Sequence, residues 1–338
     1  MPSKKFNALA SGVLLTASVS VMADVNVYSS RQEALIKPLL DQFSEQTGIQ
    51  VNLVTGADDA LISRLQLEGD KSPADLLITA DAGRLHRAKD AGLFAALQSD
   101  AVNELVPANL RDVDDQWVGL TQRARPIFYA KGRVNPDEID SYSDLTDSKW
   151  AGRICIRSSS NIYNQSLIAS MVETEGEASA LAFAEGLVAN LARPPAGGDT
   201  DQLKAAAAGV CDIAVANTYY FGRLMTSDKE SDQKVAESLG VIWPNQQGRG
   251  THVNISGIGL TKASKNADEA VQLIEFMLTP EAQTWYSEVN NEYPVVEGIE
   301  PSQALQSLGS FKADSVNLTA LGENNQRAVE LMDQAGWR

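Results

Sequence analysis

The stretch VNVYSSRQEALIKPLLDQFSEQTGIQVNLVTGADDALISRLQLEGDKSPADLLIT, residues 25 to 79, decides the fold. Short runs rich in aliphatic residues alternate there with longer segments whose apolar residues have helical spacing; the runs are residues 25–28, 51–54 and 76–79. Gly48 marks the end of the first helical segment, because glycine readily adopts the left-handed conformation that closes many helices. This alternation predicts a β-α-β-α-β unit of parallel strands covered by helices.

The rest of the chain continues this alternation and contains two extended segments. A helical apolar stripe over residues 184–191 ends at the Pro- and Gly-rich residues 194–198, and a further helix leads into the strand after Cys211. Residues 117–129 and 253–260 read as extended. We interpret these two segments as strands that cross between lobes.

We therefore predict an α/β protein of two lobes, each a mainly parallel sheet covered by helices. The first lobe is expected to comprise residues 24–121 and 251–297, and the second residues 122–250 and 298–338. Crossing strands form a hinge, and the cleft between two α/β lobes is where a ligand normally binds.

The beginning of the chain is typical of an exported protein. Lys4 and Lys5 precede an apolar stretch that ends in a small-residue cleavage motif at residues 21–23. We predict that residues 1–23 are a signal peptide and that the mature protein starts at about Asp24, in the periplasm of a bacterium. No later run reaches the roughly 18 apolar residues that span a bilayer, so we expect no membrane insertion.

Composition and motifs exclude several classes of function. The 338 residues carry a net charge of −16, which becomes −18 without Lys4 and Lys5. So acidic a surface repels nucleic acid and anionic lipid. The sequence has no GxSxG, HExxH, GKS/T or GxGxxG motif, and the serines at 158–160 have no evident base. We therefore predict a protein that is not an enzyme and does not bind nucleic acid.

Three tyrosines are the candidate metal ligands. Tyr219 and Tyr220 follow one short apolar run, and Tyr163 follows another. Phenolates are hard oxygen donors that suit a highly charged cation such as Fe(III). The two histidines, His86 on an expected solvated helix face and His252 near a crossing strand, are too few for an imidazole site. The alternative is that the tyrosines are packed aromatics with a polar tip.

The two cysteines lie at the same spacing before the tyrosine-bearing segments. Cys155 lies eight residues before Tyr163, and Cys211 lies eight residues before Tyr219. An even number of cysteines in an oxidising compartment favours a disulfide, although both could be buried thiols. A bridge between them would keep the two tyrosine-bearing segments in register.

Several strings resemble those of bacterial periplasmic ferric-ion-binding proteins. In chain order they are VYSSRQ (27–32), SPADLLITAD (72–81), TQRARPIFYAKG (121–132), RSSSNIYNQSL (157–167), ANTYYFGRL (216–224) and NQQGRGTHVNISGIG (245–259). The similarity covers essentially the whole mature chain. It implies a two-lobed type II periplasmic binding fold and a substrate-binding component of an iron ABC transporter.

The resemblance also implies a ligand set. The family's tyrosine after a Ser-rich loop matches Tyr163, and its Tyr-Tyr pair after Asn-Thr matches Tyr219 and Tyr220. Many relatives carry a His-Tyr pair after the first Ser-Ser-Arg, but this chain has Gln32 and Glu33 there. The ion is therefore expected mainly on the second lobe, with a carbonate-like anion completing the shell. Whether Gln32, Glu33 or water fills a remaining position stays open.

Arginines are the candidate partners of that anion. Arg123 and Arg125 lie two apart on a presumed strand, so both could point to one face and offer forked donors. Backbone amides at the helix start after residues 158–161 could also face the anion. Gln32 could lend an amide or merely occupy the vacated ligand position. Either arginine could equally be an ordinary ion-pair residue.

We predict a monomeric periplasmic carrier that captures Fe(III), closes its lobes and passes the ion to an inner-membrane ABC permease. One alternative is a binding protein of the same fold for an oxyanion or a polyamine. An oxyanion receptor would not need three phenols, and a polyamine site would need carboxylates. A metal-storing or iron-sensing protein that docks onto a receptor is a further alternative.

Overall fold

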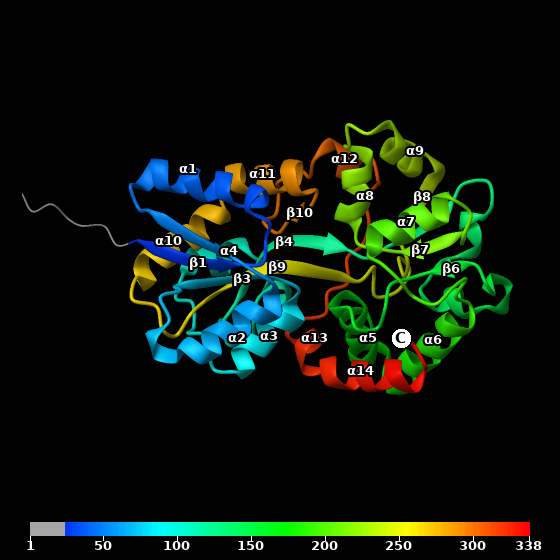
Figure 1. Cartoon of the computed structure of the whole chain (residues 1–338), viewed down its shortest axis with the longest axis horizontal. Helices are drawn as coiled ribbons and strands as arrows, with labels where there is room; N and C mark the ends of the chain where they lie inside the picture. The colour runs from blue at the N-terminus through cyan, green and yellow to red at the C-terminus, as the bar shows by residue number, and fades with distance from the viewer. Residues whose placement is uncertain (1–23) are drawn as a thin grey trace, which may run out of the picture.

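The computed structural model describes residues 24–338, and the predicted signal peptide, residues 1–23, lies outside this range. Two α/β halves lie side by side along the long axis of the molecule (Figure 1). Each half is built on its own sheet, with six strands in the first half and four in the second. The predicted two-lobed α/β fold is confirmed. Within residues 24–338, no helix is both long and apolar enough to cross a membrane.

The sheet of the first half has the strand order β10-β4-β9-β3-β1-β2. Its strands are β1 (Val25–Ser29), β2 (Val51–Thr55), β3 (Leu76–Ala80), β4 (Val118–Ala124), β9 (Val253–Leu260) and β10 (Tyr293–Pro294). β1 pairs in parallel with β2 and β3, which is the unit that the opening stretch predicts. β9 runs antiparallel between β3 and β4, so β1 to β4 point the same way and β9 is reversed.

Helices cover both faces of this sheet, with α1, α10 and α11 on one side and α2 and α3 on the other (Figure 1). The helices are α1 (Lys37–Thr47), α2 (Asp58–Glu68), α3 (Ala82–Asp90), α4 (Asp100–Leu105), α10 (Ala267–Met277) and α11 (Pro280–Asn290). The predicted stripe of α1 is buried at Leu39, Leu40 and Phe43. Gly48 ends this helix with a φ of 80°, a conformation that costs glycine little.

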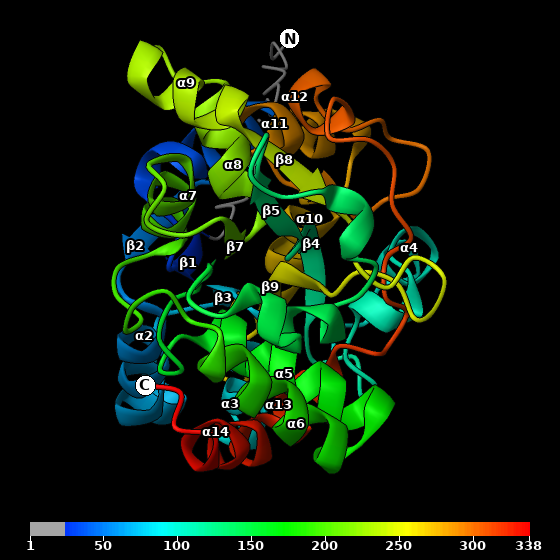
Figure 2. The same cartoon turned by 90° about the vertical axis from the view of Figure 1, so that its right-hand side faces the viewer.

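The second half has a smaller sheet with the order β6-β7-β5-β8. Its strands are β5 (Ile127–Ala130), β6 (Ile154–Cys155), β7 (Ile213–Val215) and β8 (Leu239–Ile242). β6 and β7 are parallel, and β5 is antiparallel to β7 and β8. The helices are α5 (Ile162–Glu175), α6 (Glu177–Ala189), α7 (Asp199–Ala207), α8 (Thr218–Met225), α9 (Glu230–Ser238), α12 (Gln303–Gln306), α13 (Thr319–Glu323) and α14 (Asn325–Gln334). Figure 2 shows this half facing the viewer.

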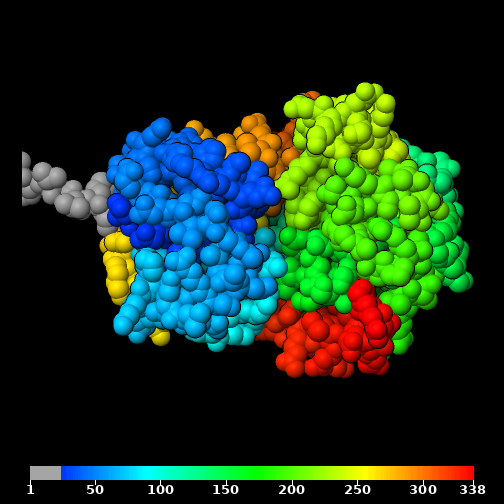
Figure 3. Space-filling view, in the orientation of Figure 1, coloured from blue at the N-terminus to red at the C-terminus, as the bar shows by residue number. Residues whose placement is uncertain are grey.

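The halves are joined by the two predicted crossing segments. β4 leads into β5 of the other sheet through only Arg125 and Pro126, and β9 pairs with β4 from Val118 to Ala124. The extended segments predicted at 117–129 and 253–260 are thereby confirmed as β4 with β5 and as β9. In the space-filling view the halves meet along a continuous seam (Figure 3).

The halves are also in contact near the C-terminus, where α13 packs against both α3 and α5. Gly322 of α13 lies directly over His86 of α3, because a Cβ there would be 2.1 Å from the imidazole Cγ. His86 is therefore buried, and our expectation of a solvated helix face was wrong. The residue boundaries of the lobes remain a prediction.

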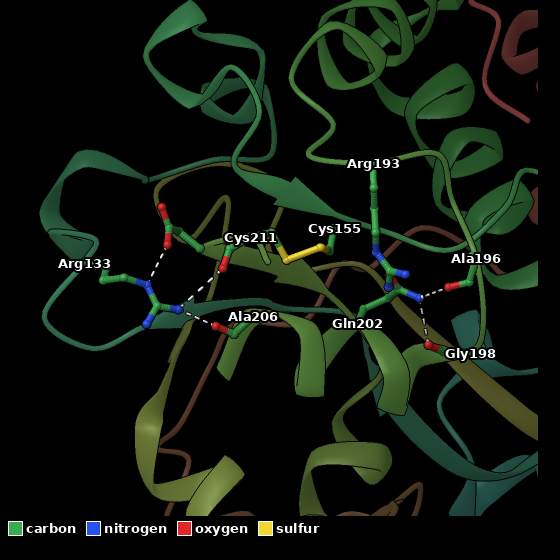
Figure 4. Close-up of a disulfide and its surroundings, with 9 residues drawn as sticks. Arg133, Cys155, Arg193, Ala196, Gly198, Gln202, Ala206 and Cys211 are labelled. Carbon is green, nitrogen blue, oxygen red and sulfur yellow. Dashed lines mark hydrogen bonds and ion pairs between the residues drawn. A yellow bond between two sulfur atoms is a disulfide. The ribbon is translucent and has the colours of Figure 1, made fainter. Parts of the chain in front are cut away.

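The predicted disulfide between Cys155 and Cys211 is present (Figure 4). Cys155 ends β6, and Cys211 lies just before β7, the parallel neighbour of β6. The bridge closes a loop across a sequence separation of 56 residues. In the chain-entropy model such a loop stabilises the fold by about 4 kcal/mol. The bridge thus ties together the strands that lead to α5 and α8.

Candidate functional site

The three predicted tyrosines converge at the boundary of the two halves. Tyr163 is the second residue of α5, and Tyr219 and Tyr220 are the second and third residues of α8. The Tyr219 hydroxyl donates to the Tyr163 hydroxyl at 3.1 Å. The ring centroids of Tyr219 and Tyr220 are 4.2 Å apart. Phenol oxygens from two helices are therefore available to one small ligand.

Each tyrosine-bearing helix follows a strand of the small sheet, and the tyrosines lie in the first turn of their helices. Asn161 caps α5, and its side-chain oxygen accepts from the backbone N–H of Tyr163 at 3.1 Å. α8 starts three residues after β7, with Asn217 as its N-cap residue. The disulfide below keeps the two strands adjacent. Both helix starts consequently point their first turns toward the other half.

The tyrosines line a cavity of about 130 Å³ to which both halves contribute residues. Its lining residues are Ser30, Arg31, Gln32, Leu35, Ala80, Arg123, Tyr163, Tyr219, Tyr220, Arg223, Ser256 and Glu292. This volume suits an ion with a small companion molecule and is well below that of an ordinary drug-sized pocket.

Burial raises the pKa of two of the tyrosines above the ordinary value of a phenol. It raises the pKa of Tyr163 to about 12; the neighbouring Tyr220 adds to this increase, and Arg123 opposes it. Burial, followed by Tyr163 and Tyr220, raises the pKa of Tyr219 well above its ordinary value. Neutral phenols at pH 7 would become strong anionic ligands only beside a cation that displaces their protons.

Arginines surround the tyrosines. Arg123 lies over the Tyr163 ring at 5.3 Å and Arg157 at 5.5 Å from the ring centroid. Arg223 lies 5.2 Å from the ring centroid of Tyr219. The site thus combines phenols with positive charge, which partly opposes the rise in the tyrosine pKa values and attracts a companion anion.

Arg123 is the predicted arginine that reaches the cavity. Its side chain is almost completely buried and lies 3.6 Å from Asp81. Its Nε and Nη2 atoms have no hydrogen-bond partner within the described chain. A buried guanidinium with unused donors next to a cavity can bind an anion there.

Arg125 does not line this cavity. β4 ends at Ala124, so the strand alternation that would place both arginines on one face stops one residue too early. The Arg125 guanidinium donates instead to Asp199, Asn217 and Asn164 at 2.7 to 2.9 Å. Of the two predicted arginines, only Arg123 lines this cavity, whereas Arg125 lines a neighbouring void together with Arg123 and Tyr163.

The first half presents an ion pair to the cavity. Glu292, only 2 % exposed, pairs with Arg31 and accepts from the Thr121 hydroxyl at 2.7 Å. Burial raises the pKa of Glu292, but the Arg31 guanidinium, its hydrogen bond and Arg123 outweigh burial and hold that pKa below its ordinary value. Gln32 lines the cavity as well, whereas Glu33 is exposed and does not.

Sequence reasoning missed four of these residues. Arg31, Arg157 and Arg223 lie within the strings that carry the family resemblance, so their closeness to predicted site residues was the available signal. Glu292 reaches the site through a contact with Arg31 across 261 residues, which no local pattern reveals. Within residues 24–338 no three His, Cys, Asp or Glu side chains cluster as metal ligands, so the tyrosines are the site's distinctive donors.

Comparison with known proteins places this geometry in context. Residues 39–313 match the family model described as bacterial extracellular solute-binding protein. "Iron uptake protein A1" of Synechocystis sp. is 46 % identical over 315 residues, covering 93 % of this chain and 88 % of the relative. "Major ferric iron-binding protein" of Neisseria meningitidis serogroup B is 28 % identical, covering 96 % of each chain.

Solved structures agree with the sequence comparison. A structure described as Trichodesmium IdiA (FutA) in complex with iron and citrate ligands has a TM-score of 0.91 and 50 % identity, covering 94 % of this chain and 100 % of that one. The ferric binding protein from Campylobacter jejuni has a TM-score of 0.88 and 42 % identity, covering 93 % and 100 %. Similarity of this extent spans both halves and the cavity between them.

Proposed function

The chain belongs to the family of bacterial extracellular solute-binding proteins, and from this premise we propose that it binds Fe(III) in the periplasm for iron uptake. Membership of this family makes it a binding protein and not an enzyme. The relatives named for iron uptake and ferric-iron binding support iron as the solute. The observation that carries the proposal is that three tyrosines from α5 and α8 line one small cavity, two of them with their hydroxyls in contact.

Tyr163, Tyr219 and Tyr220 are the proposed metal ligands. Three phenolates neutralise a triply charged ion, and hard oxygen donors match the preference of Fe(III). The ion must displace the phenol protons, because a phenol is neutral at pH 7 and burial raises the pKa of Tyr163 and Tyr219 further. Acid should therefore weaken binding, since protons compete with the ion for the same oxygens.

A small anion such as carbonate is the proposed second component. Three protein ligands leave coordination positions of an octahedral ion open. Arg123 has unused donors beside the cavity, and Arg31 and Gln32 line it from the first half. These groups can bind the anion while the tyrosines bind the metal. Arg125 is not proposed to contact the anion, because its guanidinium donates to other side chains.

Closure of the halves is the proposed means of capture and release. The cavity is lined from both halves, and the crossing strands β4 and β9 are the expected hinge. Closing excludes water and strengthens the electrostatic interactions inside the cavity. We propose that the loaded monomer docks onto an inner-membrane ABC permease, which receives the ion after opening.

A titration with ferric ion and bicarbonate tests the proposal. We expect the purified protein to bind one Fe(III) and to turn reddish, because phenolate-to-iron charge transfer absorbs visible light. A colourless mixture that produces no heat in calorimetry would reject iron binding. The same calorimeter distinguishes the oxyanion alternative, for which phosphate alone would produce heat and ferric ion no colour.

A further inference from the structure

We infer that Arg125 is a positioning residue, which sets the spacing between the helices that carry Tyr163 and Tyr219 without touching the bound ion. This inference rests on the proposed function, because it concerns the same ligands. Arg125 is only 1 % exposed and lies in the segment between β4 and β5. It therefore occupies the crossing itself, directly beneath the two helix starts.

The guanidinium of Arg125 joins three helices of the second half. Its Nη1 donates to Asp199 Oδ2 at 2.9 Å and to Asn217 Oδ1 at 2.8 Å. Its Nη2 donates to Asn164 Oδ1 at 2.7 Å. All three partners are at most 2 % exposed.

Each partner lies at the start of a helix. Asn164 is the third residue of α5 and directly follows a proposed ligand tyrosine. Asn217 is the N-cap residue of α8, two residues before another ligand tyrosine, and its side chain makes no capping hydrogen bond. Asp199 is the first residue of α7, and its Oδ2 also accepts from the backbone N–H of Asn217 at 2.8 Å. One guanidinium thus fixes both tyrosine-bearing helices relative to each other.

The backbone of Arg125 is itself fixed. Its N–H donates to the His252 carbonyl at 3.0 Å, which belongs to the second crossing segment. Its carbonyl accepts from the Tyr142 hydroxyl at 2.8 Å. The side chain therefore extends from a fixed backbone position. Its hydrogen bonds to Asn164 and Asn217 set the distance between the first turns of α5 and α8.

Stability alone explains this arrangement poorly. Helix N-termini carry a partial positive charge, so three of them around a guanidinium repel it. The carboxylate that offsets this repulsion, Asp199, is shared with Arg157 at 3.6 Å. Buried ion pairs typically contribute little stability compared with well-packed apolar side chains. The planar fork of arginine does, however, direct several hydrogen bonds at fixed angles, which a point charge cannot do. Geometry is thus what the residue contributes.

The spacing of the two helices determines the distance between the phenol oxygens. Those of Tyr163 and Tyr219 are 3.1 Å apart, although they come from different helices. A metal ion needs both oxygens at bonding distance at the same time. Without the fork, α5 and α8 would no longer share an anchor at their first turns, and the oxygens would fit one ion less well.

The test compares Arg125→Lys and Arg125→Met with the unaltered protein, each loaded with ferric ion and bicarbonate. Chelator competition measures iron affinity, and absorbance measures the position and intensity of the charge-transfer band per bound iron. We expect both variants to lose affinity by about 10- to 100-fold, as supporting residues of metal sites typically do, and to shift the band. An Arg125→Lys protein with unaltered affinity and band would overturn the inference.

A second variant covers the case in which the Arg125 variants fail to fold. Asn217→Ala removes the direct side-chain link between Arg125 and α8. Arg125 stays paired with Asp199, which still accepts from the backbone N–H of residue 217. We expect a shifted band and an affinity lower by about 10-fold. A band identical to that of the unaltered protein at saturating iron would show that the link is merely structural and would overturn the inference.

Lys89→Met is the matched control. Lys89 is 13 % exposed and pairs with the buried Asp112, but it lies in the first half, away from α5 and α8. Its loss should lower the unfolding temperature and leave the band unchanged, and a shifted band would contradict a specific role for Arg125. If the unaltered protein binds no iron, the proposed function fails. If it binds iron and the Arg125 variants match it, only the positioning role fails.

Discussion

The two walls of the cavity differ in chemistry. The second half contributes three phenols from the first turns of α5 and α8. The first half contributes a guanidinium, an amide and a carboxylate that is already paired, namely Arg31, Gln32 and Glu292. One wall therefore carries the metal donors that we propose, together with Arg223. The other carries Arg31 and Gln32, which can donate to an anion, and Glu292, which is paired with Arg31.

Local structure explains the difference. In the second half, helices that follow adjacent, disulfide-linked strands bring their tyrosines together. In the first half, β1 ends and the chain enters a short 3₁₀ turn at Glu33–Leu35, which leaves Glu33 exposed. If the second half binds the metal and the first half closes over it, substitutions in the two walls should affect iron binding to different extents.

The largest effect is expected from the second wall. Tyr219→Phe together with Tyr220→Phe should abolish the colour and lower iron affinity by at least about 1000-fold, because each lost ligand costs more than a supporting residue does. Circular dichroism should be unchanged. Tyr129→Phe, in β5 and outside the cavity, is the control. Unaltered binding in the double variant would reject the ligand assignment.

A smaller effect is expected from the ion pair of the first wall. Arg31→Gln should lower the free energy of unfolding by about 3 kcal/mol, because it leaves the Glu292 carboxylate buried without its partner. Adding Glu292→Gln should restore most of this loss. Urea unfolding of both single variants and the double variant measures the coupling. Additive losses would mean that the two residues do not interact. The charge-transfer colour of the iron-loaded protein should persist in all three variants.

The pH dependence of stability tests the ion pair of the first wall. The pKa of Glu292 is below its ordinary value, so its contribution is complete above about pH 4.3, the unfolded value, and is lost as pH falls through the folded pKa. The difference in unfolding free energy between the unaltered protein and Glu292→Gln should therefore shrink as pH falls from 7 to 3. A difference that stays constant over this range would contradict the assignment of this pKa.

The smallest effect is expected at Gln32. Its side chain is exposed and lines the cavity edge. Gln32→Ala should weaken iron binding by no more than about threefold, since a single exposed hydrogen bond to the anion contributes little. The loss should appear with bicarbonate present and vanish without it. An equal loss in both conditions would instead place Gln32 on the metal.

Much of the fold could be predicted because it is encoded locally. The runs at 25–28, 51–54 and 76–79 are β1, β2 and β3, and residues 253–260 are β9. Each run carries its own aliphatic pattern. The two-residue strands β6 and β10 are too short to show an alternating pattern, and they form through pairing with β7 and β4, which are distant in sequence.

The site was predictable only in part. The tyrosines and cysteines stand out by type and spacing, and the structure brings the three rings together and bridges the cysteines. The direction of Arg125 depends on where β4 ends, which the sequence pattern does not resolve to one residue. The pair of Arg31 with Glu292 depends on the folded arrangement of segments 261 residues apart.

A crystal structure of the iron-loaded protein, with anomalous data collected at the iron edge, tests the ligand assignment most directly. We predict one anomalous peak bonded to the phenol oxygens of Tyr163, Tyr219 and Tyr220, with an anion between the metal and Arg123. A peak bonded to side chains of the first half, or one that leaves any of the three phenols unbound, would contradict it.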